Sequence, residues 1–480
     1  MPAEEYICDP MAVRDETVSL INNGRLEIPR EVILNFGGEK GQQFCENPHT
    51  HQWYSKYGII NTLINIPPLL VEAWWNGNLP YNSPSRVIFL NFLNLALSAA
   101  MGFYLCLIAS RYTNSPWVIG IFILSAFYCT YWWNYLRAQS SEICQTLFLL
   151  GFFYHAISYL NPLTLGADVA SRRRLQVHSL LTGIFLGILI LTKTIYIILL
   201  PSLLAGIIYS GLTLARSNLQ MSLGQIFKAL FWFTKWMALP ILAALFALLA
   251  VNAYKFGSPF DTGYEEWGES HKPIFSGNIL SGLWLLLFSV QGSILLNFPI
   301  LIFALFGYRH FFKSYRADAF LVLTNGLVLF LLYAKMLNPL GTWCYGARYM
   351  IVLLPLLSLP FIFTLEFLLY NWRRWWAVVC LAGLALTLSY SFKLQLNVNA
   401  LPFFTYYRMQ HVFSFAHDAE IDDYFTSHHF GIINGEILAA KHGQPFPPLV
   451  IAEQKFDPQA TARLKAVMTK LTYSNYYWWH

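Results

Sequence analysis

Long apolar stretches separated by short polar ones occupy most of the chain, from about residue 57 to residue 394. An apolar stretch of about 20 residues is long enough to cross the hydrocarbon core of a bilayer as a helix. We predict about ten such spans, at residues 86–110, 116–134, 143–160, 179–193, 194–213, 229–252, 294–312, 319–336, 349–370 and 375–394. The pattern therefore predicts an all-α polytopic membrane protein whose bundle covers residues 86–394.

The rest of the chain divides into three segments. Residues 1–56 are polar and predict a first loop outside the bilayer, with a short helix near its start. Residues 57–85 begin with an apolar stretch that Pro67-Pro68 interrupts and Trp74-Trp75 ends. Its length is at the lower limit for crossing, so it is either an interfacial or re-entrant segment or a short span. Residues 395–480 form a small C-terminal tail.

Basic residues fall in alternate loops of this pattern, at 172–174, 216 and 228, 309–316, and 373–374. Cytoplasmic loops carry the excess of Lys and Arg, so these loops are predicted to face the cytoplasm of a plasma (inner) membrane. The other loops, the tail and, if residues 57–75 do not cross, the first loop then share the extracytoplasmic face. A first loop on that face normally follows a transmembrane helix, so we expect one upstream in the native chain or a misassigned start.

Composition narrows the class further. Of 480 residues, 56% are hydrophobic and only 12% are charged, which is too little charge for a soluble surface. The net charge of +6 comes from short basic clusters between apolar runs, so no nucleic-acid partner is indicated. The scattered cysteines predict neither a disulfide framework nor a zinc site. The sequence has no GxGxxG or P-loop pattern that would indicate a nucleotide-sugar or ATP site.

The first candidate for chemistry is Asp9, in the stretch from Cys8 to Gly24. Asp9 followed by Pro10 is typical of a helix N-cap with proline at the first helical position, and Asn22-Asn23-Gly24 is typical of a helix end. Asp9 is therefore either a capping residue or a functional carboxylate at the start of a short helix.

Two further candidates lie at or inside the ends of predicted spans. Glu142 stands at the start of a span, where an acid is costly unless it is solvated, paired or functional. It either forms a structural pair with Arg137 or takes part in catalysis. Lys193 lies within an apolar run, where its ammonium must extend to the interface or bind an anion.

The loops of the same predicted face contain the remaining candidates. Arg348 begins a span beside Trp343 and Tyr345; its planar guanidinium suits a phosphate, while the aromatic rings suit an interface or a sugar. Asp261 and Tyr264 lie in the segment after residue 252, whose acids are otherwise typical of a solvated face.

The chain resembles the GT-C superfamily of glycosyltransferases that use polyprenyl-phosphate-linked sugars. The similarity is to the family 39-like bacterial group related to protein O-mannosyltransferases and lipid A aminoarabinose transferases. It covers most of residues 8–370 and rests on the order of these motifs: C-D-P followed by S-L-I-N-N-G-R-L-E-I, then Y-S-K-Y-G, R-A-Q-S-S-E, L-T-K-T, F-G-S-P-F-D-T-G-Y and W-C-Y-G-A-R-Y.

The resemblance implies a role for each matched acid. The family's first outer loop carries an acidic catalytic base, often as Asp-Glu; Asp9 matches the Asp, and Pro10 stands where the Glu would be. Glu142 corresponds to the second outer acid, which would orient the acceptor or a metal. The departure at Pro10 leaves acceptor and metal contacts open, so no cofactor is certain and a divalent metal stays open. The family's first transmembrane helix has no counterpart before Asp9.

The residue types fit transfer from a lipid phosphate. That leaving group needs cations to neutralise it, and the acceptor hydroxyl or amine needs a carboxylate to take its proton. We expect Lys56, Lys193 and Arg348 to bind the donor phosphate, in a hexosyl or pentosyl transfer that inverts the anomeric carbon. The remaining candidates for the substrate pocket are Arg137, Trp343, Tyr345, Asp261 and Tyr264. The acceptor is a lipid, a glycan or a protein.

Two alternatives from other classes stay open. A lipid or solute transporter would suit an intramembrane lysine and proline-broken spans, but the apolar segments show no internal repeat, and the polar residues gather at span ends rather than at mid-membrane. A catalytically inactive GT-C relative that acts as an assembly partner would suit the missing first helix and Pro10.

Overall fold

The computed structural model describes residues 8–34, 43–81, 87–137, 141–165, 169–217, 223–264, 273–289, 292–341 and 346–400, with residues 458 and 462 of the tail. The elements are α1 (Cys8–Asn23), α2 (Arg30–Leu34), β1 (Phe44–Glu46), β2 (Trp53–Ser55), α3 (Ile59–Asn76), α4 (Val87–Ala109), α5 (Pro116–Tyr128), α6 (Trp132–Arg137), α7 (Ser141–Leu165), α8 (Val169–Thr192), η2 (Thr194–Ile198), α9 (Leu199–Ser217), α10 (Leu223–Phe256), α11 (Ile279–Phe288), α12 (Ile294–Asn297), α13 (Ile300–Ser314), α14 (Arg316–Ala334), η4 (Arg348–Val352), α15 (Leu354–Leu357), α16 (Phe361–Tyr370) and α17 (Trp375–Ala400). The predicted all-α fold is confirmed.

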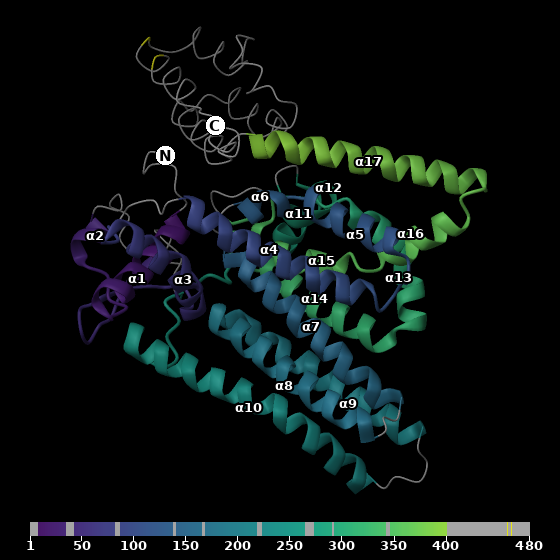
Figure 1. Cartoon of the computed structure of the whole chain (residues 1–480), viewed down its shortest axis with the longest axis horizontal. Helices are drawn as coiled ribbons and strands as arrows, with labels where there is room; N and C mark the ends of the chain where they lie inside the picture. The colour runs from purple at the N-terminus through teal and green to yellow at the C-terminus, as the bar shows by residue number, and fades with distance from the viewer. Residues whose placement is uncertain are drawn as a thin grey trace.

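Within the described ranges, seven helical segments are long and apolar enough to cross a membrane: Phe92–Ala109, Ser141–Leu160, Arg173–Thr192, Thr194–Thr213, Thr234–Phe256, Arg316–Ala334 and Trp375–Leu396. In Figure 1, α7, α8, α9 and α10 form a slanted layer of helices. The span within α7 is the most buried, so α7 is the centre of the bundle. On α8, Gly183 permits close approach, because a Cβ there would collide with the backbone of Met237 on α10. The chain is a multi-pass membrane protein.

Several predicted spans are not single helices. The stretch 294–312 is split into α12 and α13 at Phe298-Pro299, and 349–370 is divided into η4, α15 and α16 around Pro355 and Pro360. Proline lacks the N–H that an interior helical residue donates, so each of these breaks falls at or next to a proline. The stretch 116–134 contains α5, which ends at Tyr128, and the start of α6. A ten-residue apolar helix, α11, lies in the segment predicted as an outer loop.

The first loop folds onto one end of the bundle (Figure 1). Helix α1 packs on α3, and the hairpin β1–β2 pairs antiparallel with Cys45 opposite Tyr54. The side-chain amide of Asn47 donates to the carbonyl oxygen of Tyr254 at 2.9 Å, which attaches the hairpin to the last turn of α10. Residues 8–34 and 43–58 are therefore anchored at the end of the bundle where α10 finishes.

Helix α3 buries several polar side chains and exposes several large apolar ones, although Leu69 is buried. Asn61 and Thr62 are buried, whereas Leu70, Trp74 and Trp75 are exposed, Trp74 by 81%. This inverted pattern suits a helix whose outer face lies in the membrane interface, where Trp is enriched. Although it has 18 residues, α3 is not among the seven segments that meet the criteria for a span.

Candidate active site

A buried ion pair joins the start of α7 to the start of η4. Nε of Arg348 lies 2.8 Å from Oε1 of Glu142, and the two side chains are 11% and 2% exposed. Both residues are candidates from the sequence, although they lie 206 residues apart along the chain. The described partner of Glu142 is thus Arg348. Because the contact uses Nε, Glu142 fixes the direction of the guanidinium, which carries five N–H donors in all.

The backbone before Arg348 is shaped by a glycine. Gly346 has φ +69°, in the left-handed region that favours glycine, and its position lies against the ring of buried Tyr131. The hydroxyl of Tyr131 then donates to the carbonyl oxygen of Ala347 at 3.2 Å. The glycine of the W-C-Y-G-A-R-Y motif therefore permits the turn that carries Arg348 toward Glu142.

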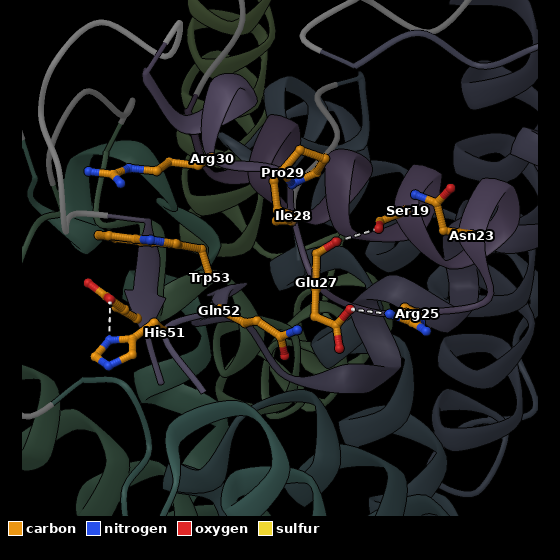
Figure 2. A pocket seen from close by; sticks show the side chains of 11 residues that line it. Ser19, Asn23, Arg25, Glu27, Ile28, Pro29, Arg30, His51, Gln52 and Trp53 are labelled. Atoms are coloured by element: carbon orange, nitrogen blue, oxygen red, sulfur yellow. Dashed lines mark hydrogen bonds and ion pairs between the residues drawn. The ribbon is translucent and has the colours of Figure 1, made fainter. Parts of the chain in front are cut away.

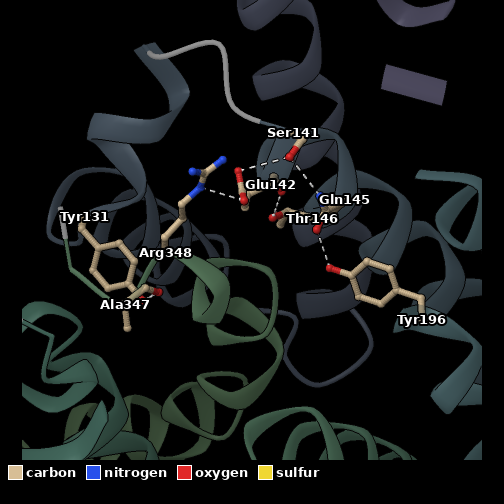
Figure 3. A network of polar contacts seen from close by, with 8 residues as sticks. All are labelled: Tyr131, Ser141, Glu142, Gln145, Thr146, Tyr196, Ala347 and Arg348. Atoms are coloured by element: carbon tan, nitrogen blue, oxygen red, sulfur yellow. Dashed lines mark hydrogen bonds and ion pairs between the residues drawn. The ribbon is translucent and has the colours of Figure 1, made fainter. Parts of the chain in front are cut away.

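A chain of hydrogen bonds runs from Glu142 into the bundle (Figure 3). Ser141 donates to Oε2 of Glu142 at 3.4 Å, Gln145 donates to Ser141 at 3.1 Å, and Tyr196 donates to Gln145 at 2.6 Å. The hydroxyl of Thr146 donates to the backbone oxygen of Glu142 at 2.7 Å. Buried polar groups that satisfy one another in this way hold a fixed geometry. Ser141, Gln145 and Tyr196 had not been selected from the sequence.

Lys193 lies near Arg348, in the break between α8 and η2. Its Nζ is 4.5 Å from the ring centroid of Tyr349, the residue after Arg348. The ring of Tyr349 stacks on that of Tyr333, with centroids 5.7 Å apart. An ammonium over an aromatic face is attracted by the ring quadrupole. Two of the three predicted cations, Lys193 and Arg348, therefore lie close together, because Lys193 lies over the ring of the residue that follows Arg348.

The first loop reaches this region through Gly58, which closes the Y-S-K-Y-G motif. A Cβ on Gly58 would collide with the carbonyl oxygens of Leu191 and Thr192, the two residues before Lys193. The side-chain amide of Asn61 donates to the same Thr192 oxygen at 3.3 Å. Because φ of Gly58 is −62°, glycine is needed here for space rather than for its backbone angle.

Lys56, two residues before Gly58, lies against the segment that follows α10. Its Nζ is 5.2 Å from the ring centroid of Tyr264 and 5.9 Å from that of Tyr57. In the same segment, Asp261 accepts a hydrogen bond from the backbone N–H of Gly263 at 2.8 Å. The structure thus brings Lys56 close to Tyr264. Gly58, two residues after Lys56, contacts the end of α8 beside Lys193.

A second buried ion pair, which the sequence had not suggested, fixes α1 to the bundle. Nζ of Lys255 on α10 lies 2.7 Å from Oε1 of Glu16 and donates to the carbonyl oxygen of Tyr57 at 3.0 Å. Thr62 donates to the other oxygen of Glu16 at 2.6 Å. Burial raises the pKa of Glu16, and attraction to Lys255 opposes that rise. The signal in the sequence was the adjacent acids Asp15 and Glu16, which are both buried.

A pocket of about 820 Å³ opens on the first loop beside the last turn of α1 (Figure 2). Its walls carry a charged pair, Glu27 at 3.9 Å from Arg25, and a contact of 3.1 Å between Glu46 and the His51 ring. Its lining is Ser19, Asn23, Arg25, Glu27, Ile28, Pro29, Arg30, Glu46, His51, Gln52 and Trp53. Mixed charges and an indole suit a hydroxyl-rich ligand better than a simple anion. No residue of the predicted site lines this pocket.

Four predicted residues lie where their side chains are not described. Asp9 is in the first turn of α1, which begins at Cys8, so Asp9 lies inside the helix rather than before it. Arg137 is the last residue of α6. Trp343 and Tyr345 fall outside the described residues. Among the described residues, no three His, Cys, Asp or Glu side chains gather as a metal site would require.

Comparisons with known proteins identify the fold. The crystal structure of ArnT from Cupriavidus metallidurans bound to undecaprenyl phosphate aligns with a TM-score of 0.51 and 14% identity, over 97% of this chain and 72% of that one. The archaeal oligosaccharyltransferase AglB from Archaeoglobus fulgidus, in complex with an inhibitory peptide and a dolichol-phosphate, aligns with a TM-score of 0.47 and 12% identity, over 88% of this chain and 55% of that one. No family model and no curated protein matches the sequence.

The chain therefore has the GT-C fold seen in the ArnT structure. The resemblance inferred from the motifs is confirmed at the level of the fold. At 14% identity, the relation to ArnT is one of architecture.

Proposed function

We propose that this protein is a glycosyltransferase that transfers a sugar from a polyprenyl-phosphate donor to an acceptor at the end of the bundle where Glu142 and Arg348 meet. One observation carries the proposal: Lys193 and Arg348 converge there, one over the ring of Tyr349 and one fixed by Glu142. Cations aimed at a phosphate stabilise the charge that develops as it leaves. The fold supports a lipid-borne donor, since the ArnT structure with this architecture contains undecaprenyl phosphate.

In the proposed reaction, the acceptor oxygen or nitrogen attacks the anomeric carbon while the bond from that carbon to the phosphate oxygen breaks. The lipid phosphate leaves with its negative charge neutralised by Lys193 and Arg348, and with Lys56 reaching it from the first loop. Asp9 takes the proton of the acceptor, as the resemblance implies. A single displacement of this kind inverts the configuration of the sugar.

Glu142 acts in this scheme mainly as a positioning residue. Its carboxylate holds Nε of Arg348, which sets the guanidinium plane that would face the phosphate. This role differs from direct orientation of the acceptor or a metal, because Glu142 is only 2% exposed. We place the site on the extracytoplasmic face, because the basic loops lie at the other ends of the spans.

The test is a transfer assay with the full chain in liposomes, including any native sequence upstream of Met1. The donors are undecaprenyl phosphates that carry a labelled hexose or a labelled pentose, an extract of cell-envelope lipids, glycans and proteins supplies the acceptor, and the readout is labelled sugar released from the donor lipid. We expect release with at least one donor and a loss of 100-fold or more in Asp9→Asn, in line with the contribution of a general base, about 10²–10⁴.

The matched control is Glu31→Gln, which removes an exposed acid of the same loop. Full release by Glu31→Gln with loss in Asp9→Asn supports the assignment of Asp9. Unchanged release in Asp9→Asn would refute Asp9 as the base. No release by the unmodified chain with any of these donors would refute the proposed function.

A further inference from the structure

A cluster of basic side chains lies at the end of the bundle opposite Glu142. Arg111, in the connection after α4, donates through Nη1 to the hydroxyl of Ser158 on α7 at 3.1 Å. Ser158 is sixteen residues along α7 from Glu142, or about 24 Å at the rise of an α-helix. Since the hydrocarbon core of a bilayer is about 30 Å thick, Arg111 lies near the interface on the opposite side.

Two histidines connect α7 and α8 beside this arginine. Nδ1 of His155 lies 2.9 Å from Nδ1 of His178, so one ring donates and the other accepts. The stacked ring of Phe185 covers His155, with centroids 5.5 Å apart. Arg174 precedes His178 by about one turn of α8, and Ser158, which Arg111 contacts, follows His155 by about one turn of α7. Helices α4, α7 and α8 thus bring their basic side chains to one place.

The guanidinium of Arg111 has an unmet hydrogen-bonding requirement. Its Nε is buried and has no hydrogen-bond partner among the described residues. Two carboxylates face the same connection, and each accepts a hydrogen bond from a hydroxyl there. Asp318 accepts from Tyr112 at 3.0 Å, and Glu366 accepts from Thr113. Leaving a buried donor without an acceptor is unfavourable, so the position favours an anion that accepts from Arg111.

The cluster is also next to a lipid-facing surface. Arg174 is exposed, and it stands three residues before Val177, so the two share one face of α8. Val177 is exposed as well, although it is apolar, and the span of α8 begins at Arg173. An arginine at the first residues of a span, on an apolar outer face, lies at the depth of lipid phosphates.

We propose that Arg111, Arg174 and His178 form a binding site for the phosphate of an anionic phospholipid, at the membrane interface opposite the Glu142–Arg348 pair. The lipid would bind between α4 and α8 and hold these helices against α7. Its phosphate oxygens would accept from the two guanidinium groups, and its acyl chains would lie along the apolar face that includes Val177. The site is separate from the proposed transfer reaction.

The experiment uses the full chain in nanodiscs of phosphatidylcholine alone or of an equimolar mixture with phosphatidylglycerol. Native mass spectrometry counts the retained lipid, and the unfolding temperature reports its effect on stability. We expect phosphatidylglycerol to be retained and to raise the unfolding temperature. Arg174→Gln, which alters an exposed side chain, should lower retention about tenfold, and Arg111→Gln should lower it further.

The matched control is Arg373→Gln, which removes an exposed basic residue in the α16–α17 connection whose described contact is with the ring of Trp372. It should retain phosphatidylglycerol like the unmodified chain. Equal retention in Arg174→Gln and the unmodified chain would overturn the proposal, as would an equal loss in Arg373→Gln. Equal stabilisation by inorganic phosphate in phosphatidylcholine nanodiscs would also overturn it, because the ligand would then be a soluble anion.

Discussion

At the scale of single residues, the candidate site depends on charges that position one another. Glu142 holds Arg348 by Nε, and Arg348 is followed by the tyrosine that lies under Lys193. A buried ion pair adds little to stability by itself, because desolvation offsets the attraction between the charges. Instead, the Glu142 carboxylate sets the direction in which the Arg348 guanidinium points. Loss of the carboxylate should therefore weaken phosphate binding as well as the fold.

Glu142→Gln tests this positioning role. The amide keeps the size of the side chain and one acceptor oxygen but loses the charge, so we expect a loss of about 1.5–3 kcal/mol in stability, the range of a charged hydrogen bond. The unfolding free energy in detergent measures it, and a weaker affinity for undecaprenyl phosphate in Glu142→Gln distinguishes positioning of Arg348 from a purely structural role. Ser141→Ala is the control, since it removes only the 3.4 Å contact and should cost less than about 1 kcal/mol. Equal losses in both variants would contradict the role assigned to Glu142.

Glu16 predicts a pH dependence of stability. Burial raises the pKa of Glu16 in the folded chain, so the folded state holds this proton more tightly than the unfolded state does. The resulting stabilisation is fully present below about pH 4.3, the ordinary pKa of a glutamate, and is lost as the pH rises through the folded pKa. Unfolding temperatures across this range should show that dependence in the unmodified chain and a weaker one in Glu16→Gln. An equal change of unfolding temperature with pH in both proteins would contradict this role of Glu16.

At the scale of elements, the contact between the first loop and α8 depends on close backbone approach. Gly58 lies against the carbonyl oxygens that end α8, just before Lys193, while Lys255 of α10 holds Glu16 of α1 and the oxygen of Tyr57. Together these contacts fix the loop that carries Lys56 and Asp9 to the ends of two membrane helices.

Gly58→Ala should therefore be destabilising and should separate Lys56 from Lys193. An added methyl that collides with backbone, which cannot rotate away, typically costs about 1–3 kcal/mol. Gly120→Ala in α5 is the control, because a Cβ there meets nothing within 4 Å. Replacing an open helical glycine by alanine should stabilise by up to about 1 kcal/mol. If the unfolding free energy changes in the same direction in both variants, the close approach of Gly58 to the end of α8 is contradicted.

Much of the fold and part of the candidate site could be predicted from the sequence. There are physical reasons why the rest could not. Apolar length predicted the membrane fold, and the alternation of basic loops predicted that Glu142, Lys193 and Arg348 share one face. The breaks at Pro299 and Pro360 were missed because hydropathy does not register a missing N–H. The pairing of Glu16 with Lys255 was missed because contacts between distant segments leave no local periodicity.

At the scale of the whole molecule, the described polar clusters lie at two ends of the bundle. One end has the first loop, its pocket and the Glu142–Arg348 pair; the other has Arg111, the two histidines and the basic connections. The end of α10 contacts the first loop, so the first loop lies at the same end of the bundle as the termination of that helix. A site for a lipid donor at one membrane face requires such a difference between the two ends of the bundle.

Single cysteines at the two ends test the polarity. In a background with the native cysteines replaced by serine, Glu31→Cys should react with a membrane-impermeant maleimide added to intact cells, while Arg373→Cys should react only after lysis. Both positions are exposed, so accessibility rather than burial decides the result. Labelling of both residues, or of Arg373→Cys alone, in intact cells would contradict the proposed orientation.

The central claim is that Lys193 and Arg348 bind the phosphate of a lipid donor, and the binding of undecaprenyl phosphate to the purified full chain tests it most directly. A lost hydrogen bond to a charged group is worth about 1.5–3 kcal/mol, so Lys193→Gln and Arg348→Gln should each bind about 10-fold to 150-fold more weakly. Arg309→Gln, an exposed position on α13 near the basic connections, should bind like the unmodified chain. Equal affinity in all four proteins would contradict the account.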